Sequence, residues 1–185
     1  VMITAAATSD LTAKTCSPVS SHWTDDTHAL TAGTARAVFE RGGKSWYFIT
    51  VDHAFGHALQ KEATTVVETL GGKVVGTSRH PINTADYSSF LLQAQSSGAD
   101  VVAFASVGDD FTKAVKQADE FGLTNGRQTL TGFLVYVTDI KGLGLPVAHG
   151  LTFSEAFYWD QNDAARAFAK RFQERTGAMP TKNQA

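Results

Sequence analysis

The chain has 185 residues, of which 43% are hydrophobic and 18% charged, a composition that excludes a disordered chain and favours one domain with a sizeable core. Its net charge of −2 gives no indication of a nucleic-acid partner, and no apolar run approaches the length of a membrane span. The single cysteine, Cys16, cannot form an internal disulfide, so it favours neither an oxidising nor a reducing compartment. We expect Cys16 to be a buried structural thiol rather than a nucleophile.

Short apolar runs alternate along the chain with segments whose apolar residues recur at helical spacing. The first predicted element is a helix at 25–41, and each later predicted helix follows a predicted strand. The predicted strands cover 44–51, 73–80, 100–107, 127–135 and 149–157. The predicted helices cover 25–41, 55–72, 87–98, 110–122 and 163–176. Asp86 and Asp109 are predicted N-caps, and glycines are predicted to end the helices. This order predicts an α/β fold, an open parallel sheet with helices on both faces.

The first strand ends in polar residues at a position where open α/β sheets bind ligands. Asp52, His53 and Phe55 are therefore expected at a functional rim. His53 and His57 are four residues apart, but no third ligand or adjacent glutamate completes a zinc motif. We interpret both histidines as rim side chains and expect no metal. Acid–base catalysis by Asp52 and His53 stays open as an alternative.

Five segments, taken in order, resemble the type I periplasmic solute-binding proteins of ABC importers, and in particular their Leu/Ile/Val-binding branch. The segments are ATSDLT (7–12), TVDHAFGHAL (50–59), NTADYSSFLLQAQSSGADVVAFASVGDD (83–110), QADEFGL (117–123) and TLTGFLV (129–135). The resemblance implies two α/β lobes that close on a solute, with no catalytic group and no cofactor. It also implies that the chain is an excerpt of a longer protein.

The same resemblance divides the chain into three parts. Residues 1–22 correspond to a strand and an anion-binding loop of lobe 1, residues 23–156 to a nearly complete lobe 2, and residues 157–185 to a helical return to lobe 1. We expect the central part to be compact and the two ends to pack poorly, because their partner strands lie outside the chain.

The resemblance also implies where a solute binds. Ala7, Thr8 and Ser9 match a loop that holds a carboxylate through backbone N–H groups and a hydroxyl. Phe55 matches an aromatic residue that packs on the solute. The residues alone leave two simpler roles open: Ser9 can be a helix cap and Phe55 a hydrophobic staple.

Two departures from the amino-acid binders concern the solute. Leu134 stands where they have an acidic partner for the ammonium, and Val107 or Gly108 stands where they often have a polar group. A buried ammonium without a partner costs several kcal/mol, so α-amino acids are disfavoured. An aromatic carboxylic acid is favoured, because Phe55, Phe133 and Tyr136 offer stacking faces.

The expected partners follow from the same resemblance. They are a small carboxylate and the membrane permease of an ABC importer, with no nucleic acid, for a monomeric protein in the periplasm. A ligand-sensing domain of a receptor or regulator on the same fold is the alternative, because fold alone does not decide function.

Overall fold

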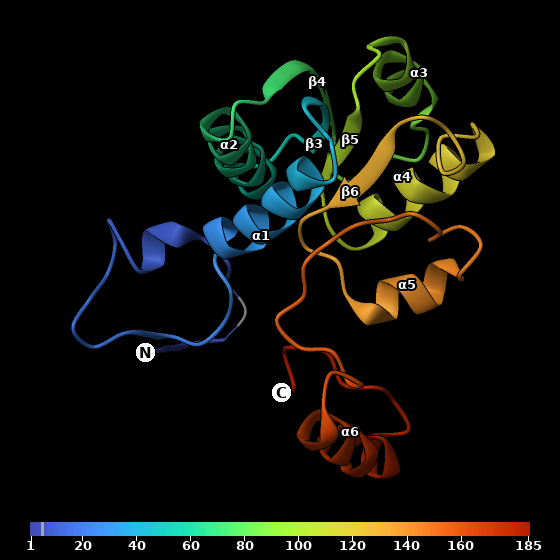
Figure 1. The fold of residues 1–185 in the computed structure, drawn as a ribbon. Coiled ribbons are helices and arrows are strands. Elements are labelled where there is room, and N and C mark those ends of the chain that lie inside the picture. Colours follow the sequence, from blue (N-terminus) through green and yellow to red (C-terminus); the bar gives the residue numbers. More distant parts are fainter. Residues whose placement is uncertain (5) are drawn as a thin grey trace.

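The computed structural model describes residues 1–4 and 6–185 and is built around a four-stranded parallel sheet (Figure 1). The strands occur in the order β4-β3-β5-β6, and each crossover carries a helix. Their bounds are β3 Ser45–Val51, β4 Lys73–His80, β5 Val101–Ala105 and β6 Thr129–Gly132. The predicted α/β class and parallel sheet are confirmed, and the four observed strands fall within the predicted runs.

Helices cover both faces of the sheet. Because successive side chains of a strand point to opposite faces, each central strand contributes to two cores. Trp46 and Phe48 pack into one core with helices α1 and α2, whereas Tyr47 and Ile49 pack into a second core with α3 and α4. The helices are α1 Thr27–Glu40, α2 Ala54–Thr69, α3 Ser88–Ser96 and α4 Asp109–Glu120. The central strands β3 and β5 are buried on both faces and are accordingly mostly apolar on both, whereas the edge strand β4 alternates exposed and partly buried residues over most of its length.

The helix ends match the predicted glycine stops but not the predicted N-caps. Gly71, Gly98 and Gly122 follow α2, α3 and α4 and all have positive φ, which glycine adopts at little cost. Asp86 accepts a hydrogen bond from the Ser88 N–H at 2.9 Å, but α3 begins one residue later than a cap at that position requires. Gly108 occupies the N-cap position of α4, so Asp109 is the first helical residue rather than its cap.

The segment after β6 differs most from the prediction. Residues 149–157 form no strand and contribute only an isolated bridge between Thr131 and Thr152, so the predicted fifth strand is wrong. A short helix that the sequence did not predict, α5 Val137–Leu143, precedes this segment. The Asp139 carboxylate accepts the N–H of Tyr136 at 2.9 Å, and this bond stabilises the first turn of α5 despite its β-branched residues.

The terminal segments lie outside the four-stranded sheet. Strand β1 (Met2–Ile3) pairs in parallel with β2 (Ser21–His22), and the 3-10 helix η1 (Ser9–Leu11) lies between them in the chain. Helix α6, Asp163–Thr176, matches the predicted helix and lies away from the sheet near the C-terminus (Figure 1). Cys16 is exposed, which corrects the expectation of a buried thiol.

Candidate functional site

A pocket of about 270 Å³ opens at the carboxyl ends of β3, β4 and β5, which is the edge where open α/β sheets bind ligands. Two of the predicted site residues, Phe55 and Val107, line it together. Gly108 and Leu134 are not among its lining residues. The full lining consists of Val51, His53, Phe55, Ile82, Asn83, Val107, Asp109 and Asp110.

The position of Phe55 is set by the close approach of α2 to the sheet. Gly56 is buried, and a Cβ there would lie 2.4 Å from the Val51 carbonyl oxygen and 3.0 Å from that of Ala105. Only glycine allows this contact, which holds the first turn of α2 against β3 and β5. The Phe55 N–H donates to Nδ1 of His53, the N-cap, at 3.3 Å. The half-buried ring of Phe55 is therefore presented at the rim.

The loop after β4 supplies a pocket wall that the sequence analysis missed. Ile82 and Asn83 line the pocket, and Asn83 has a φ of 62°, a backbone conformation that asparagine tolerates better than most residues. Asp110 lines the pocket from α4. The available signal was the run Pro81-Ile82-Asn83 directly after a strand, a turn-forming sequence at the ligand-binding edge.

The predicted anion loop lies against α1 and α2. The Thr8 hydroxyl accepts the Asp10 N–H at 3.3 Å and caps η1. The Ser9 N–H donates to Oγ1 of Thr27 at 3.4 Å, and the Ser9 hydroxyl donates to Oε1 of Glu62 at 3.2 Å. Glu62, which the sequence analysis did not single out, thus places a carboxylate at this loop.

The remaining predicted site residues occupy different surroundings. Ala7 and Leu134 are half-buried and pack against the same core cluster as Phe55. Tyr136 is the N-cap of α5, and its hydroxyl accepts a hydrogen bond from Asn183 Nδ2 at 3.4 Å. It lines a separate 340 Å³ pocket beside α6. Phe133 is fully buried and stacks on Phe48 at 6.3 Å, which corrects the expectation that it offers a face to the solute.

The two histidines of the rim have distinct partners. His53 caps α2, whereas Nε2 of His57 lies 2.8 Å from Oδ1 of Asp52. Both members of this second pair are solvent-exposed at the side chain. Within residues 1–4 and 6–185 the structure contains no group of three His, Cys, Asp or Glu side chains placed to hold a metal ion.

A buried charge cluster joins three segments that are distant in sequence. The Lys182 ammonium pairs with Asp25, before α1, and lies 3.8 Å from Oε1 of Glu155. The side chains of Lys182 and Glu155 are only 6% and 11% exposed. Burial raises the pKa of Glu155 to about 7. The positive charge of Lys182 opposes this rise, and the negative charges of Asp25 and Asp139 reinforce it.

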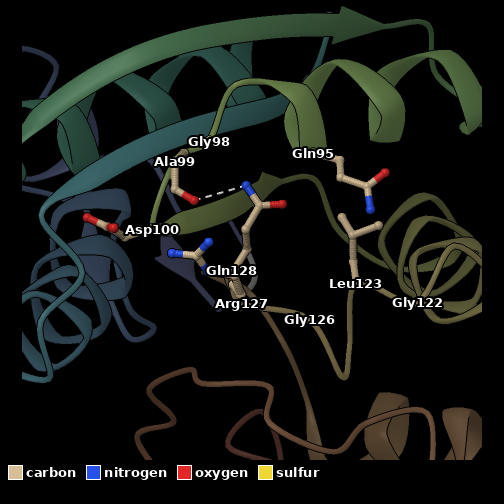
Figure 2. Close-up of a pocket in the computed structure, with 9 residues that line it drawn as sticks. All are labelled: Gln95, Gly98, Ala99, Asp100, Gly122, Leu123, Gly126, Arg127 and Gln128. Carbon is tan, nitrogen blue, oxygen red and sulfur yellow. Dashed lines mark hydrogen bonds between the residues drawn. The ribbon is translucent and has the colours of Figure 1, made fainter.

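A further cavity of about 370 Å³ lies at the opposite edge of the sheet, near the amino ends of β5 and β6 (Figure 2). The Gln128 side chain crosses it and donates to the carbonyl oxygens of Ala99 and Ala94, at 2.9 Å and 3.0 Å. This edge is not where parallel sheets bind solutes. The cavity is thus a gap between the ends of α3 and α4 rather than a solute site.

Comparison with known proteins agrees with the fold. The chain matches the model of the periplasmic binding protein family over residues 1–185. It is 42% identical to a periplasmic binding protein from Burkholderia mallei, with a TM-score of 0.92 over 99% of this chain and 48% of that one. It is 36% identical to a branched-chain amino acid ABC transporter periplasmic ligand-binding protein from Burkholderia xenovorans LB400, with a TM-score of 0.92 over 100% and 49% of the two chains.

A shorter match involves the Leu/Ile/Val-binding protein homolog 7 of Brucella abortus. The two are 35% identical over 71 residues, which is 38% of this chain and 18% of that protein. The chain spans about half the length of the solved relatives that it matches. No helix in the described part of the chain combines the length and hydrophobicity that a membrane crossing requires. The chain belongs to the periplasmic binding protein family.

Proposed function

We propose that this chain forms part of the solute-binding surface of an extracytoplasmic component of an ABC uptake system. Residues 23–156 supply one lobe, and the segments 1–22 and 157–185 belong to the second lobe of a longer, monomeric, periplasmic protein. The rim pocket at the carboxyl ends of β3–β5 supports this division, since a solute held there is covered only when a second lobe closes over it. The partner is the membrane permease, and the function requires no cofactor.

We further infer that the solute is a small carboxylic acid, with an aromatic acid favoured over an amino acid. The observation that carries this inference is the environment of Leu134. Its half-buried side chain packs against the core cluster that Phe55 and Ala7 also contact, outside the lining of the rim pocket, and Leu134 itself offers neither charge nor hydrogen bond to an ammonium. Phe55 at the pocket offers an aromatic face.

The loop of Ala7, Thr8 and Ser9 is the proposed carboxylate site. Backbone N–H groups and hydroxyls at the start of a helical turn favour an anion, although here the Ser9 groups are bonded to Thr27 and Glu62. A solute carboxylate must therefore displace those two contacts. Val107 lines the rim pocket, and we propose that Gly108, which follows it in the chain, extends the contact surface between β5 and α4. Tyr136, which lines the separate pocket beside α6, is proposed to reach the solute from the start of α5 only when the two lobes close.

Two structural relatives show that this fold accommodates such acids. A solute-binding protein from Rhodopseudomonas palustris, 19% identical with a TM-score of 0.84, was solved with benzoate. Another from R. palustris HaA2, 23% identical with a TM-score of 0.83, was solved with p-hydroxybenzoic acid. At these sequence identities the similarity concerns the fold alone. The solute proposed for this chain is therefore argued from its own residues.

One observation favours an amino acid as the second candidate. Asp109 is exposed and lines the same pocket as Phe55, so its carboxylate can face an ammonium. Asp109→Asn separates the two candidates, because it abolishes amino-acid binding if Asp109 pairs with the ammonium. If the solute is an acid, the same change preserves or improves its binding.

A thermal-shift screen of the full-length protein against amino acids and aromatic acids tests the proposed function. A solute that binds only the folded form raises the melting temperature with its concentration. We expect shifts with benzoate-like acids and smaller or no shifts with leucine. Shifts with amino acids alone contradict the proposed solute, and the absence of any shift across both sets contradicts solute binding of this class.

A further inference from the structure

The loop between β4 and α3, residues 81–87, is held by hydrogen bonds from α4. Asp110, in the first turn of α4, is only 8% exposed, and both of its carboxylate oxygens have a partner. Oδ2 accepts the N–H of Asn83 at 3.1 Å, and Oδ1 accepts the hydroxyl of Tyr87 at 3.1 Å. One buried carboxylate thus fixes two points of the loop.

A second side chain of α4 holds the far end of the same loop. Gln117 accepts the N–H of Tyr87 through Oε1 at 2.7 Å and donates from Nε2 to the Ala85 carbonyl oxygen at 2.8 Å. Gln117 does not line the rim pocket, whereas Asp110 does. Variants of Asp110 and Gln117 can therefore distinguish an effect on the pocket wall from an effect on the stability of the loop as a whole.

The residue that Asp110 fixes has an unusual backbone conformation. Asn83 is the only non-glycine residue of the described ranges 1–4 and 6–185 with positive φ, and this conformation persists only where the surroundings hold it. Its neighbour Ile82 is a large apolar side chain that is 54% exposed. Both line the pocket with Phe55 and Val107, so the conformation at Asn83 determines how this wall faces the solute.

The anchor is itself supported from β4 and α3. The Tyr87 ring is fully buried and contacts the ring of His80 edge-on, at 4.9 Å between centroids. Burial and the neighbouring Asp110 charge raise the pKa of the Tyr87 hydroxyl, so it stays a hydrogen-bond donor to the carboxylate at neutral pH. Asp110 is therefore held in one orientation before any solute arrives.

We propose that Asp110 is a positioning residue for solute binding, which fixes the backbone of Asn83 and thereby sets the Ile82–Asn83 wall of the rim pocket. This inference rests on the proposed function. It deepens that function, because part of the solute specificity is then determined by a buried carboxylate that need not touch the solute. A loop that is loose at Asn83 presents Ile82 and Asn83 in many orientations, and the solute must order it at a cost in affinity.

The experiment compares Asp110→Asn with Gln117→Ala in the full-length protein. Calorimetry with benzoate gives the affinity, and amide hydrogen exchange without solute gives the protection of the Asn83 N–H. In Asp110→Asn we expect exchange at Asn83 to be at least tenfold faster and Kd to rise at least fivefold. In Gln117→Ala we expect a lower melting temperature with Kd within twofold of the unmodified protein. Asp86→Asn, a change in the same loop at an exposed residue bonded to Ser88, is the control for the loss of one charge.

The outcomes separate this inference from the proposed function. Unchanged exchange at Asn83, unchanged affinity, or equal losses of affinity in Asp110→Asn and Gln117→Ala each overturn the positioning role while benzoate binding by the unmodified protein stands. If the unmodified protein does not bind benzoate, the proposed solute fails and the role in binding falls with it, whereas exchange still reports whether Asp110 holds the loop. Should Asp110→Asn not fold, Asn83→Pro, which excludes positive φ, must weaken binding more than Asn83→Ala, and equal effects overturn the inference.

Discussion

The hydroxyl of Ser9 donates a hydrogen bond to Oε1 of Glu62 at 3.2 Å, so the loop proposed to receive a solute carboxylate is bonded to a carboxylate of the protein. The other carboxylate oxygen of Glu62, Oε2, lies 3.4 Å from Nδ1 of His28. The Ser9 hydroxyl, which an acidic solute would use as a hydrogen-bond donor, thus already donates to Glu62. A solute that replaces this bond works against the negative charge of Glu62.

Glu62→Gln should therefore strengthen the binding of an acid. Glutamine keeps an acceptor for Ser9 but removes the charge that repels the solute carboxylate. We expect Kd for benzoate to fall about two- to tenfold, equivalent to roughly 0.4–1.4 kcal/mol. Calorimetry measures the change, with Glu68→Gln as the control at an exposed position of the same helix. Weaker binding in Glu62→Gln would remove Ser9 from the proposed site.

Phe55→Ala should weaken solute binding with little loss of stability. The Phe55 ring is half-buried at the pocket, so its removal leaves no large internal cavity, and we expect the free energy of unfolding to fall by less than about 1.5 kcal/mol. Phe111→Ala is the comparison, because Phe111 is fully buried and its loss should cost about 3–5 kcal/mol. Denaturant unfolding and calorimetry check both quantities. A large stability loss in Phe55→Ala would assign the ring to the core instead.

Strands and glycine-ended helices could be predicted because their local signals agree with their burial. The run at 44–51 is apolar on both faces, which is what a central strand of a covered sheet requires, and Gly71 and Gly122 take positive φ after their helices. The segment 149–157 has the composition of a strand, but it makes only the bridge at Thr152. Composition alone does not reveal whether a neighbouring strand is available for pairing.

The candidate site was predictable only in part, for a similar reason. Phe55 follows from the rule that strand ends form the ligand edge, and Val107 follows from the resemblance to the binding proteins. The contributions of Asn83, Asp110 and Glu62 depend on segments that are distant in sequence meeting in space. No spacing in the sequence brings Asn83 to Asp110, because that contact depends on the relative positions of the loop after β4 and the first turn of α4.

The stability of the protein should depend on pH through Glu155. Its pKa is raised from 4.5 to about 7 in the folded state, first by burial, with Lys182 opposing and Asp25 and Asp139 reinforcing the shift. Between these two values the folded chain binds more protons than the unfolded chain. The free energy of unfolding therefore falls as the pH rises through this window and stays lower above it, by about 3 kcal/mol at most.

Denaturant unfolding of the unmodified protein and of Glu155→Gln at pH 5 and pH 8 measures this contribution. We expect the variant to lose less stability between the two pH values, because glutamine does not titrate. Glu174→Gln, at an exposed position of α6, should behave like the unmodified protein. The same pH dependence in all three proteins would exclude Glu155 as its source.

The central claim is that the full-length protein binds an acid with an apolar body in preference to an α-amino acid, and calorimetry at neutral pH tests it most directly. Leu134, at the position that corresponds to the acidic partner in amino-acid binders, offers an ammonium no partner, and a shortfall of about 3 kcal/mol corresponds to roughly a hundredfold in affinity. We predict that benzoate or a phenylpropanoid acid binds more tightly than leucine or phenylalanine by a factor of this order. Tight binding of leucine with no response to the aromatic acids would contradict the claim and would assign the ammonium to an acidic residue such as Asp109.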